Sequence, residues 1–252
     1  MPRVAIASLR RVTRDGARTD QDLVAVEAPL AIEIVSDAGR HALGVFLRTP
    51  GDDEALGAGL LYAEGLIRRA SDIRDSTLTL AAGLIVDAAA LARSGVATTA
   101  CGLCGRLTMT SQAQRGATGP RAEIAPEQVF ALPARLRGAQ AVFEKTGGLH
   151  AAALVDRGGV IVDTAEDVGR HNAVDKVIGR ALLSGTPDPP GHERVLVVSG
   201  RVAFELVQKA AMAGVDALVA IGAPTSLAIQ AARDAGLTLI GFAKDGSYNN
   251  YA

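Results

Sequence analysis

Two cysteines separated by two residues are the side chains of this chain best suited to chemistry. The sequence reads Cys101-Gly102-Leu103-Cys104-Gly105 and contains no other cysteine. Two thiols at this spacing can exchange with each other, and a neighbouring thiol or helix dipole can lower the pKa of the attacking thiol. The flanking glycines permit backbone movement and close approach of another molecule. Three chemistries fit the pair: thiol–disulfide exchange, half of a zinc site, and a relay in which a thiolate carries sulfur as a persulfide.

The zinc and redox interpretations lack their usual companions. A zinc site needs two more ligands, but there is no second cysteine pair and the four histidines are scattered along the chain. A thioredoxin-like pair is expected inside an early βαβ unit, which the residues before Cys101 do not indicate. Two inert cysteines in a tight turn are the structural alternative, which the glycines on both sides disfavour. We therefore expect no zinc and no other metal site.

A dense polar run at residues 166–176 is the second candidate. It reads Glu-Asp-Val-Gly-Arg-His-Asn-Ala-Val-Asp-Lys. On a helix, His171 lies one turn from Asp175, and Asn172 lies one turn from Lys176. A solvated helix face is the alternative, but the mixture of imidazole, amide and charged groups favours a site. His150 follows two glycines, and by itself it is better explained as a hydrogen-bonded structural histidine.

Two turns could bind an anion. Ser199-Gly200-Arg201 and Pro224-Thr225-Ser226 each lie between the carboxyl end of an expected strand and the start of an expected helix. Helix N-termini bind anions, and ligands of open α/β sheets bind beyond the carboxyl ends of strands. Arg201 adds a guanidinium group suited to phosphate. Ordinary helix capping by Ser199 and Ser226 is the alternative, but two such turns in succession favour a phosphate-bearing ligand.

The elements that position these turns are clearest in the last third of the chain. Apolar runs at 195–198, 217–221 and 237–242 predict buried parallel strands, with helices at 202–213 and 227–235 between them. Upstream we expect a hairpin of strands at 151–155 and 160–163, and a helix at 168–183. A further helix starts at Pro126, and Pro133 is expected to break it or to start another helix reaching residue 145.

The first half predicts a smaller β-rich unit. Strands are expected at 23–35, 41–48 and 78–86, a helix between residues 52 and 65, and a mobile loop at 97–105. The fold class is α/β, or α+β overall. We expect an N-terminal arm at 1–22, a β-rich domain at 23–120 that carries the cysteine loop, and an α/β domain at 121–252 with a mixed, partly parallel sheet.

Composition excludes several classes of function. The net charge is −1, aromatic residues make up 3 % and Trp is absent, so a nucleic-acid surface is not expected. No stretch approaches the ~20 apolar residues of a membrane span, and residues 1–14 contain no apolar h-region, so we expect no signal peptide. We expect a cytoplasmic protein without membrane contact. Structural disulfides are rare in the cytoplasm, so the two cysteines need another explanation.

Taken together, these segments resemble the FdhD family, the formate dehydrogenase accessory proteins. The matching segments follow the family order from about residue 23 to the end of the chain. They are Arg48-Thr-Pro-Gly-Asp-Asp-Glu54, Glu64-Gly-Leu-Ile67, Cys101-Gly-Leu-Cys-Gly105, Thr146-Gly-Gly-Leu-His-Ala151, the run at 166–176, Val198-Ser-Gly-Arg201, Ala223-Pro-Thr-Ser226 and Gly241-Phe-Ala243.

The resemblance implies a sulfurtransferase. A cysteine desulfurase would load Cys101 with sulfur, Cys104 would assist or relay it, and the acceptor would be the molybdenum cofactor bis-molybdopterin guanine dinucleotide of formate dehydrogenase. It also implies a homodimer and a cytidine-deaminase-like fold for the α/β domain. Deaminase activity is not expected, because His150-Ala151-Ala152 lacks the catalytic glutamate. The expected cofactor-binding residues are His150, Arg170, His171, Asn172, Ser199, Gly200, Arg201, Thr225, Ser226, Phe242, Ala243, Lys244, Asp245, Gly246 and Ser247.

Two other functions remain open at this stage. One is a non-catalytic chaperone that binds the molybdenum cofactor and delivers it to formate dehydrogenase. The other is a redox-active or zinc-binding thiol protein. Sulfur gained at Cys101 from a desulfurase would distinguish the carrier from the chaperone, and zinc analysis with thiol titration would test the third class.

Overall fold

A computed structural model describes residues 1–37, 39–75, 78–81, 124–185 and 189–252 of the chain. Cys101, Cys104 and the loop expected around them lie outside the described residues. The expected strand at 78–86 falls partly outside them, and its described residues form only isolated β-bridges. Among the helices that the structure describes, none has the length and apolar character needed to span a bilayer.

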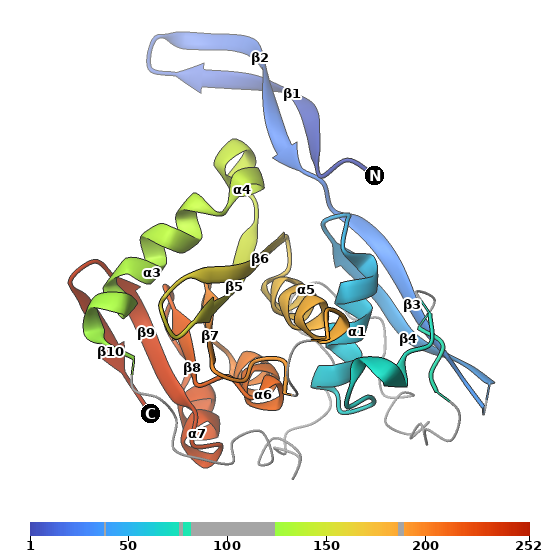
Figure 1. Cartoon of the computed structure of the whole chain (residues 1–252). Helices are drawn as coiled ribbons and strands as arrows, with labels where there is room; N and C mark the ends of the chain where they lie inside the picture. The colour runs from blue at the N-terminus through green and yellow to red at the C-terminus, as the bar shows by residue number, and fades with distance from the viewer. Residues whose placement is uncertain (38, 76–77, 82–123, 186–188) are drawn as a thin grey trace.

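A mixed six-stranded sheet forms the centre of the molecule (Figure 1), with the strand order β10-β9-β8-β7-β5-β6. Strands β7 (Arg194–Val198), β8 (Ala217–Ala220) and β9 (Thr238–Lys244) are parallel, as predicted. Strands β5 (His150–Asp156) and β6 (Ile161–Asp167) form the predicted hairpin, and β5 runs antiparallel to β7. Strand β10 (Ser247–Asn250) was not predicted, because this short polar edge strand has no apolar alternation. The expected mixed, partly parallel sheet is confirmed, and the likeness to cytidine deaminases stays a prediction.

Helices cover both faces of this sheet. Alternate strand residues point to opposite faces, so Leu154 and Leu196 pack with α5 (Arg170–Leu183), α6 (Phe204–Ala213) and α7 (Ser226–Asp234). Their neighbours Val155 and Val195 face the other side and pack with α3 (Pro126–Gly138), which is followed by α4 (Ala141–Thr146). The central strands are apolar throughout because helices cover both of their sides.

The expectation for Pro133 was wrong. Helix α3 continues through this proline to Gly138, and α4 begins only at Ala141. Proline removes one backbone hydrogen bond from a helix interior. Val129, Leu132 and Leu136 nevertheless lie buried on one face of α3 against the sheet, and this packing outweighs the loss of one bond.

A second layer packs on α5. Strands β3 (Ala28–Ser36) and β4 (Gly39–Arg48) form the predicted hairpin, and α1 (Asp53–Ala63) is followed by the short 3₁₀ helix η1 (Ala70–Asp72). Helices α1 and α5 approach closely, since a Cβ added at Gly59 would lie 1.9 Å from the backbone oxygen of Asp175. Side chains of this layer join the same hydrophobic cluster as the sheet. The boundary near residue 120 lies outside the described residues, so the division into domains stays a prediction.

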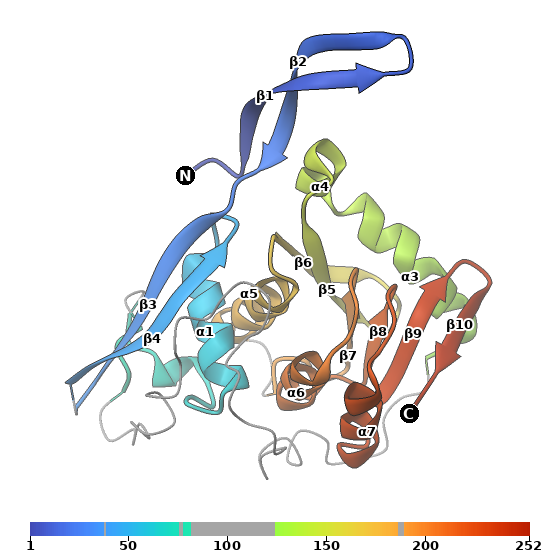
Figure 2. The ribbon, with the colours of Figure 1, turned by 180° about the vertical axis from the view of Figure 1, so that it is seen from behind.

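The N-terminal segment is a hairpin rather than a loose arm. Strands β1 (Val4–Thr13) and β2 (Gly16–Ala25) pair along their whole length and project from the body (Figures 1 and 2). Ile6 pairs with Leu23, and Val4 pairs with Ala25. Residues 23–25 therefore belong to this hairpin, and the first core strand begins only at Ala28.

Candidate functional site

The carboxyl edge of the sheet brings together most of the predicted site residues that the structure describes. The predicted turns follow β7 and β8 at this edge, and Phe242 lies near the end of β9. Because β5 runs antiparallel to β7, its first residue, His150, lies at the same edge. His150 pairs across the strands with Asp167, the last residue of β6, which is followed directly by α5.

Glycines let the turns of this edge approach one another. A Cβ added at Gly222 would lie 2.7 Å from the backbone carbon and oxygen of Gly200. A Cβ added at Gly241 would lie 2.7 Å from Cδ of Pro224. The Phe242 N–H donates to the Gly222 carbonyl at 3.1 Å. A larger residue at these positions would push the turns apart, so glycine is required by close backbone approach.

The structure does not support the alternative that Ser199 and Ser226 are helix caps. Thr225 is the N-cap of α7, where its hydroxyl accepts a hydrogen bond from the Ala228 N–H at 3.3 Å. Ser226 is the first residue inside α7, so it does not cap this helix as the alternative interpretation required. Ser199 does not cap α6 either, because its hydroxyl accepts from the Ala151 N–H of β5 at 2.9 Å. Thr225 and Ser226 are exposed at the edge.

Cationic and imidazole groups line this edge. Arg201 is exposed and forms no ion pair with any residue that the structure describes. The half-buried His150 ring lies beside Gly200, where a Cβ would be 3.1 Å from its Nδ1. Burial, followed by the charges of Arg170 and Arg201, lowers the pKa of His150. The exposed guanidinium of Arg201, just before α6, is suited to binding an anion.

His171 is the most perturbed histidine of the site. Burial lowers its pKa to about 3, with further contributions from Lys209, Arg170 and His150, so the ring is neutral at pH 7. Its Nε2 atom is buried and has no hydrogen-bond partner among the described residues. Buried polar atoms are almost always paired, so this unpaired nitrogen singles out His171 as a candidate site residue.

Phe242 presents an aromatic ring at the edge. Its side chain is 48 % exposed, and its backbone has φ = 53°, a conformation that non-glycine residues rarely adopt. The neighbouring Ala243 is buried against α3, whereas Lys244, Asp245, Gly246 and Ser247 are exposed. An exposed ring in a strained backbone is typical of a functional position, here one that could stack on a planar base.

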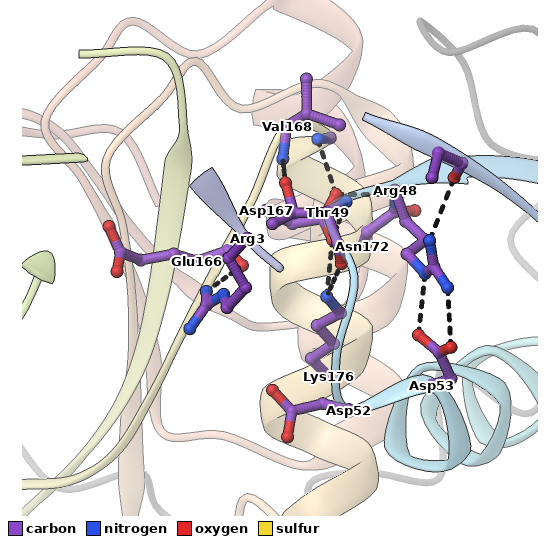
Figure 3. Close-up of polar contacts among 12 residues, drawn as sticks. Arg3, Arg48, Thr49, Asp52, Asp53, Glu166, Asp167, Val168, Asn172 and Lys176 are labelled. Atoms are coloured by element: carbon purple, nitrogen blue, oxygen red, sulfur yellow. Dashed lines mark hydrogen bonds and ion pairs between the residues drawn. The ribbon is translucent and has the colours of Figure 1, made fainter. Parts of the chain in front are cut away.

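A buried network ties α5 to the connection between β4 and α1 (Figure 3). The fully buried Asp167 forms an ion pair with Lys176 at 2.7 Å and accepts hydrogen bonds from the Thr49 N–H at 3.1 Å and the Asn172 amide at 2.9 Å. Lys176 also donates to the Thr49 carbonyl at 2.7 Å, and Asn172 donates to the Leu47 carbonyl at 2.9 Å. Asn172 was predicted to bind a cofactor, but its amide nitrogen is used inside the protein.

A second buried ion pair connects α5 to α6. Lys209 donates to the two carboxylate oxygens of Asp175 at 2.6 and 2.9 Å. Burial raises the pKa of Asp175 to about 6, against the opposing effect of Lys209. Buried pairs of this kind stabilise a fold only when both partners remain, because a lone buried charge is costly.

Several contacts around the site escaped prediction. Thr49 in the network and Lys209 in the ion pair with Asp175 were not predicted. Asp167 and Glu166 lie in the predicted run, but Asp167 accepts from the Thr49 N–H, and Glu166 accepts from the Val142 and Phe143 N–H groups in the first turn of α4. The available signal for Lys209 is a lysine within the otherwise mainly apolar helix α6. Over the described ranges, no group of three or more His, Cys, Asp or Glu side chains could hold a metal ion. Because both cysteines lie outside those ranges, the absence of zinc stays a prediction.

Comparison with known proteins gives one consistent result. A sulfur carrier protein FdhD from Streptomyces avermitilis is 42 % identical, with 95 % of this chain and 90 % of that protein covered. The protein of the same name from Anaeromyxobacter sp. strain K is also 42 % identical, over 100 % of this chain and 93 % of the other. A crystal structure described as a formate dehydrogenase accessory protein from Desulfotalea psychrophila has a TM-score of 0.74 at 22 % identity, covering 99 % of this chain and 97 % of that chain, which supports the fold. Since the FdhD/NarQ family model matches residues 25–252, the chain belongs to the FdhD/NarQ family.

Proposed function

We propose that this chain is a sulfur carrier that accepts sulfur from a cysteine desulfurase and passes it to the molybdenum cofactor required by formate dehydrogenase. The observation that carries the proposal is 42 % identity, over nearly the whole chain, to relatives named sulfur carrier protein FdhD. The pair Cys101 and Cys104 supplies the only thiols of the chain. A carrier that holds sulfur on a thiol would therefore use Cys101 or Cys104.

The loading step is a thiol exchange reaction. The Cys101 thiolate attacks the outer sulfur of a persulfide on the desulfurase, a new S–S bond forms at Cys101, and the cysteine of the desulfurase leaves as a thiolate. Only the thiolate is a competent nucleophile, so a lowered thiol pKa would accelerate loading. Cys104 assists as a second thiol or relay partner.

The acceptor, bis-molybdopterin guanine dinucleotide, is cargo rather than a resident cofactor in this proposal. The residues at the carboxyl edge fit its nucleotide part. Arg201 and the helix start at Thr225 suit phosphate oxygens. The exposed ring of Phe242 suits a guanine base. The edge thus supports placing the nucleotide there, beside residues from β5, β7, β8 and β9.

Intact-mass spectrometry tests sulfur loading. The purified protein is incubated with a cysteine desulfurase and cysteine, beside Cys101→Ala and Cys104→Ala variants. We expect the wild-type mass to increase by one sulfur atom and the Cys101→Ala mass to stay unchanged. No gain in the wild type with an active donor would contradict sulfur carriage. Release of the added mass by a reducing agent provides the control for a persulfide.

A non-catalytic cofactor chaperone is the second candidate. The observation that favours it is the exposed Arg201 beside the start of α7 at Thr225, which suits an anion whatever the chemistry of the thiols. Nucleotide binding without a gain of sulfur at Cys101 would select the chaperone. The cytoplasmic location, the homodimer and the contact with formate dehydrogenase belong to both candidates and stay predictions.

A further inference from the structure

We propose that Tyr251 is a positioning residue of the candidate nucleotide site, because its ring holds Pro224 and with it the turn that follows β8. This inference rests on the proposed function, since it places a further residue behind the surface that is assigned to the nucleotide. Tyr251 lies outside every segment of the family resemblance, whose last expected cofactor contact is Ser247. The contacts of its ring and of its backbone support this role.

The ring of Tyr251 packs where Gly241 leaves room for it. A Cβ added at Gly241 would lie 3.1 Å from Cε2 of Tyr251 and 2.7 Å from Cδ of Pro224. Asn249 pairs with Gly241 across the strands, so Tyr251, two residues later, points to the same face of the sheet. Aromatic side chains reach such diagonal neighbours on an adjacent strand. The tyrosine ring and the proline ring therefore meet over one bare backbone position.

The backbone of Tyr251 is held from two sides. Its N–H donates to the Leu239 carbonyl of β9 at 2.8 Å. Its carbonyl accepts from Nε of Arg233, in the last turn of α7, at 3.2 Å. The end of the chain accordingly lies beside α7 in both views (Figures 1 and 2). A side chain fixed by both β9 and α7 can keep a neighbouring turn in place.

Pro224 connects this contact to both candidate anion-binding turns. Its nitrogen carries no hydrogen, so no hydrogen bond from that nitrogen can fix it. The backbone around it forms a short parallel bridge, in which the Val202 N–H donates to the Ala223 carbonyl at 3.1 Å and the Thr225 N–H donates to the Val202 carbonyl at 2.9 Å. Arg201 directly precedes Val202 in the sequence, and Thr225 directly follows Pro224. A shift of Pro224 would therefore displace the guanidinium group and the N-cap of α7 together.

Simple packing is the alternative role of the ring, and it predicts a different result. A ring that only fills space would affect the free energy of unfolding and leave the affinity for a ligand unchanged. A positioning ring acts on the ligand through Arg201 and the start of α7. Its removal should therefore matter less once Arg201 has been removed, because residues that act as one unit have non-additive effects.

Calorimetry with GDP-mannose measures the effect on affinity. This nucleotide contains guanine and a pyrophosphate esterified at both ends, as the proposed acceptor does. We expect Tyr251→Ala to lower the affinity about threefold to tenfold, whereas Tyr251→Phe keeps the ring and should retain the wild-type affinity. Tyr248→Ala is the matched control, because it removes the same side chain from β10 where the ring packs against Phe130 of α3. It should also retain the wild-type affinity.

A double-mutant cycle separates positioning from packing. In the Arg201→Ala background, the loss caused by Tyr251→Ala should shrink to about twofold or less, the part that acts through the start of α7. Pro224→Ala tests the same contact from its other side. It removes the proline ring and keeps both hydrogen bonds of the bridge, so it remains informative if Tyr251→Ala is poorly folded. We expect it to lower the affinity by a factor similar to that of Tyr251→Ala.

Three results would overturn this inference and leave the proposed site intact. They are wild-type affinity in Tyr251→Ala or Pro224→Ala, an equal loss from Tyr251→Ala with and without Arg201, and a loss in Tyr251→Phe as large as that in Tyr251→Ala. The last result would assign the effect to the hydroxyl group rather than to the ring. No binding of GDP-mannose to the wild type would contradict the placement of the nucleotide and this inference together, while sulfur loading is judged separately by mass.

Discussion

The buried face between α1 and α5 and the carboxyl edge of the sheet use similar residue types in opposite ways. At the α1–α5 face, Lys176 and Asp167 are buried, paired and hydrogen-bonded to backbone groups of the β4–α1 connection. At the edge, Arg201 is exposed without an ion pair to any described residue, and the buried Nε2 of His171 has no partner there. The first set is paired within the fold, whereas the second set has no partner among the residues that the structure describes.

This contrast separates structural from functional residues within one motif. The run at 166–176 supplies both kinds, since Asp167, Asn172 and Lys176 form the network while the Nε2 of His171 has no partner among the described residues. Satisfied polar groups hold the fold, and unsatisfied groups with perturbed pKa values mark candidate sites. Motif membership alone therefore does not assign a residue to ligand binding.

The largest expected effect is at the network. Lys176→Met leaves the charge of Asp167 buried and unpaired, and we expect the free energy of unfolding to fall by about 3–5 kcal/mol. Urea denaturation measures it. Lys145→Met, at an exposed lysine, is the control and should change stability by less than about 0.5 kcal/mol. A loss at Lys176 no larger than that at Lys145 would show that the network does not hold α5.

The pH dependence of stability distinguishes His171 from its neighbour Asp175. His171 titrates at about 3 in the fold against an ordinary 6.5, so its contribution to stability is lost as the pH falls through this range. Asp175 titrates at about 6 against an ordinary 3.8. Between pH 6 and pH 3.8 the Asp175 carboxyl group is therefore protonated in the folded state but not in the unfolded state, and the free energy of unfolding rises as the pH falls through this range. The two contributions oppose each other in the wild type.

Replacing His171 should expose the contribution of Asp175. From pH 6 to pH 4, we expect His171→Gln to gain stability over the wild type by about 1 kcal/mol per pH unit. Urea denaturation at a series of pH values gives the two curves, and their difference cancels all other titrating groups. Parallel curves would mean that His171 is protonated in the fold, which contradicts a neutral ring at the edge.

Two glycine substitutions compare the regions directly. Gly59→Ala places a Cβ 1.9 Å from the Asp175 oxygen, so α1 and α5 must separate, and we expect a loss of about 1–3 kcal/mol in stability. Gly222→Ala pushes the edge turns apart and should weaken nucleotide binding as well. Gly138→Ala, where no atom lies within 4 Å of the added Cβ, is the control for both. Equal stability of Gly59→Ala and Gly138→Ala would contradict the close helix crossing.

The smallest expected effect on folding is at Phe242. Phe242→Ala should weaken GDP-mannose binding by about 1–3 kcal/mol if the ring stacks on the base. Phe242→Gly removes the same ring but also relieves the positive φ, so it should be more stable than Phe242→Ala by about 1 kcal/mol. Thermal unfolding and calorimetry measure the two effects separately. Unchanged affinity in both variants would exclude Phe242 from the site.

The sequence predicts the parallel strands well because their apolar runs are long and bounded by turns. It also predicts that the turns after β7 and β8 lie near each other, since parallel strands end at one edge. It does not predict the buried network of Asn172 and Asp167, whose partners Leu47 and Thr49 lie 125 and 118 residues away and leave no local signal. The β1–β2 hairpin was missed because charged residues interrupt its alternation, and Pro133 was misjudged because packing on the sheet overrides a local propensity.

One matched pair of substitutions tests the central claim that the carboxyl edge, and not the α1–α5 face, binds the nucleotide. Arg201→Ala and Arg48→Ala remove the same side chain from the two regions. Arg48 is buried, and two of its guanidinium nitrogens donate to Asp53 at 2.8 Å. We predict that Arg201→Ala lowers the affinity for GDP-mannose about tenfold or more at unchanged unfolding free energy, whereas Arg48→Ala lowers stability at unchanged affinity. Wild-type affinity in Arg201→Ala together with lost binding in folded Arg48→Ala would contradict this account.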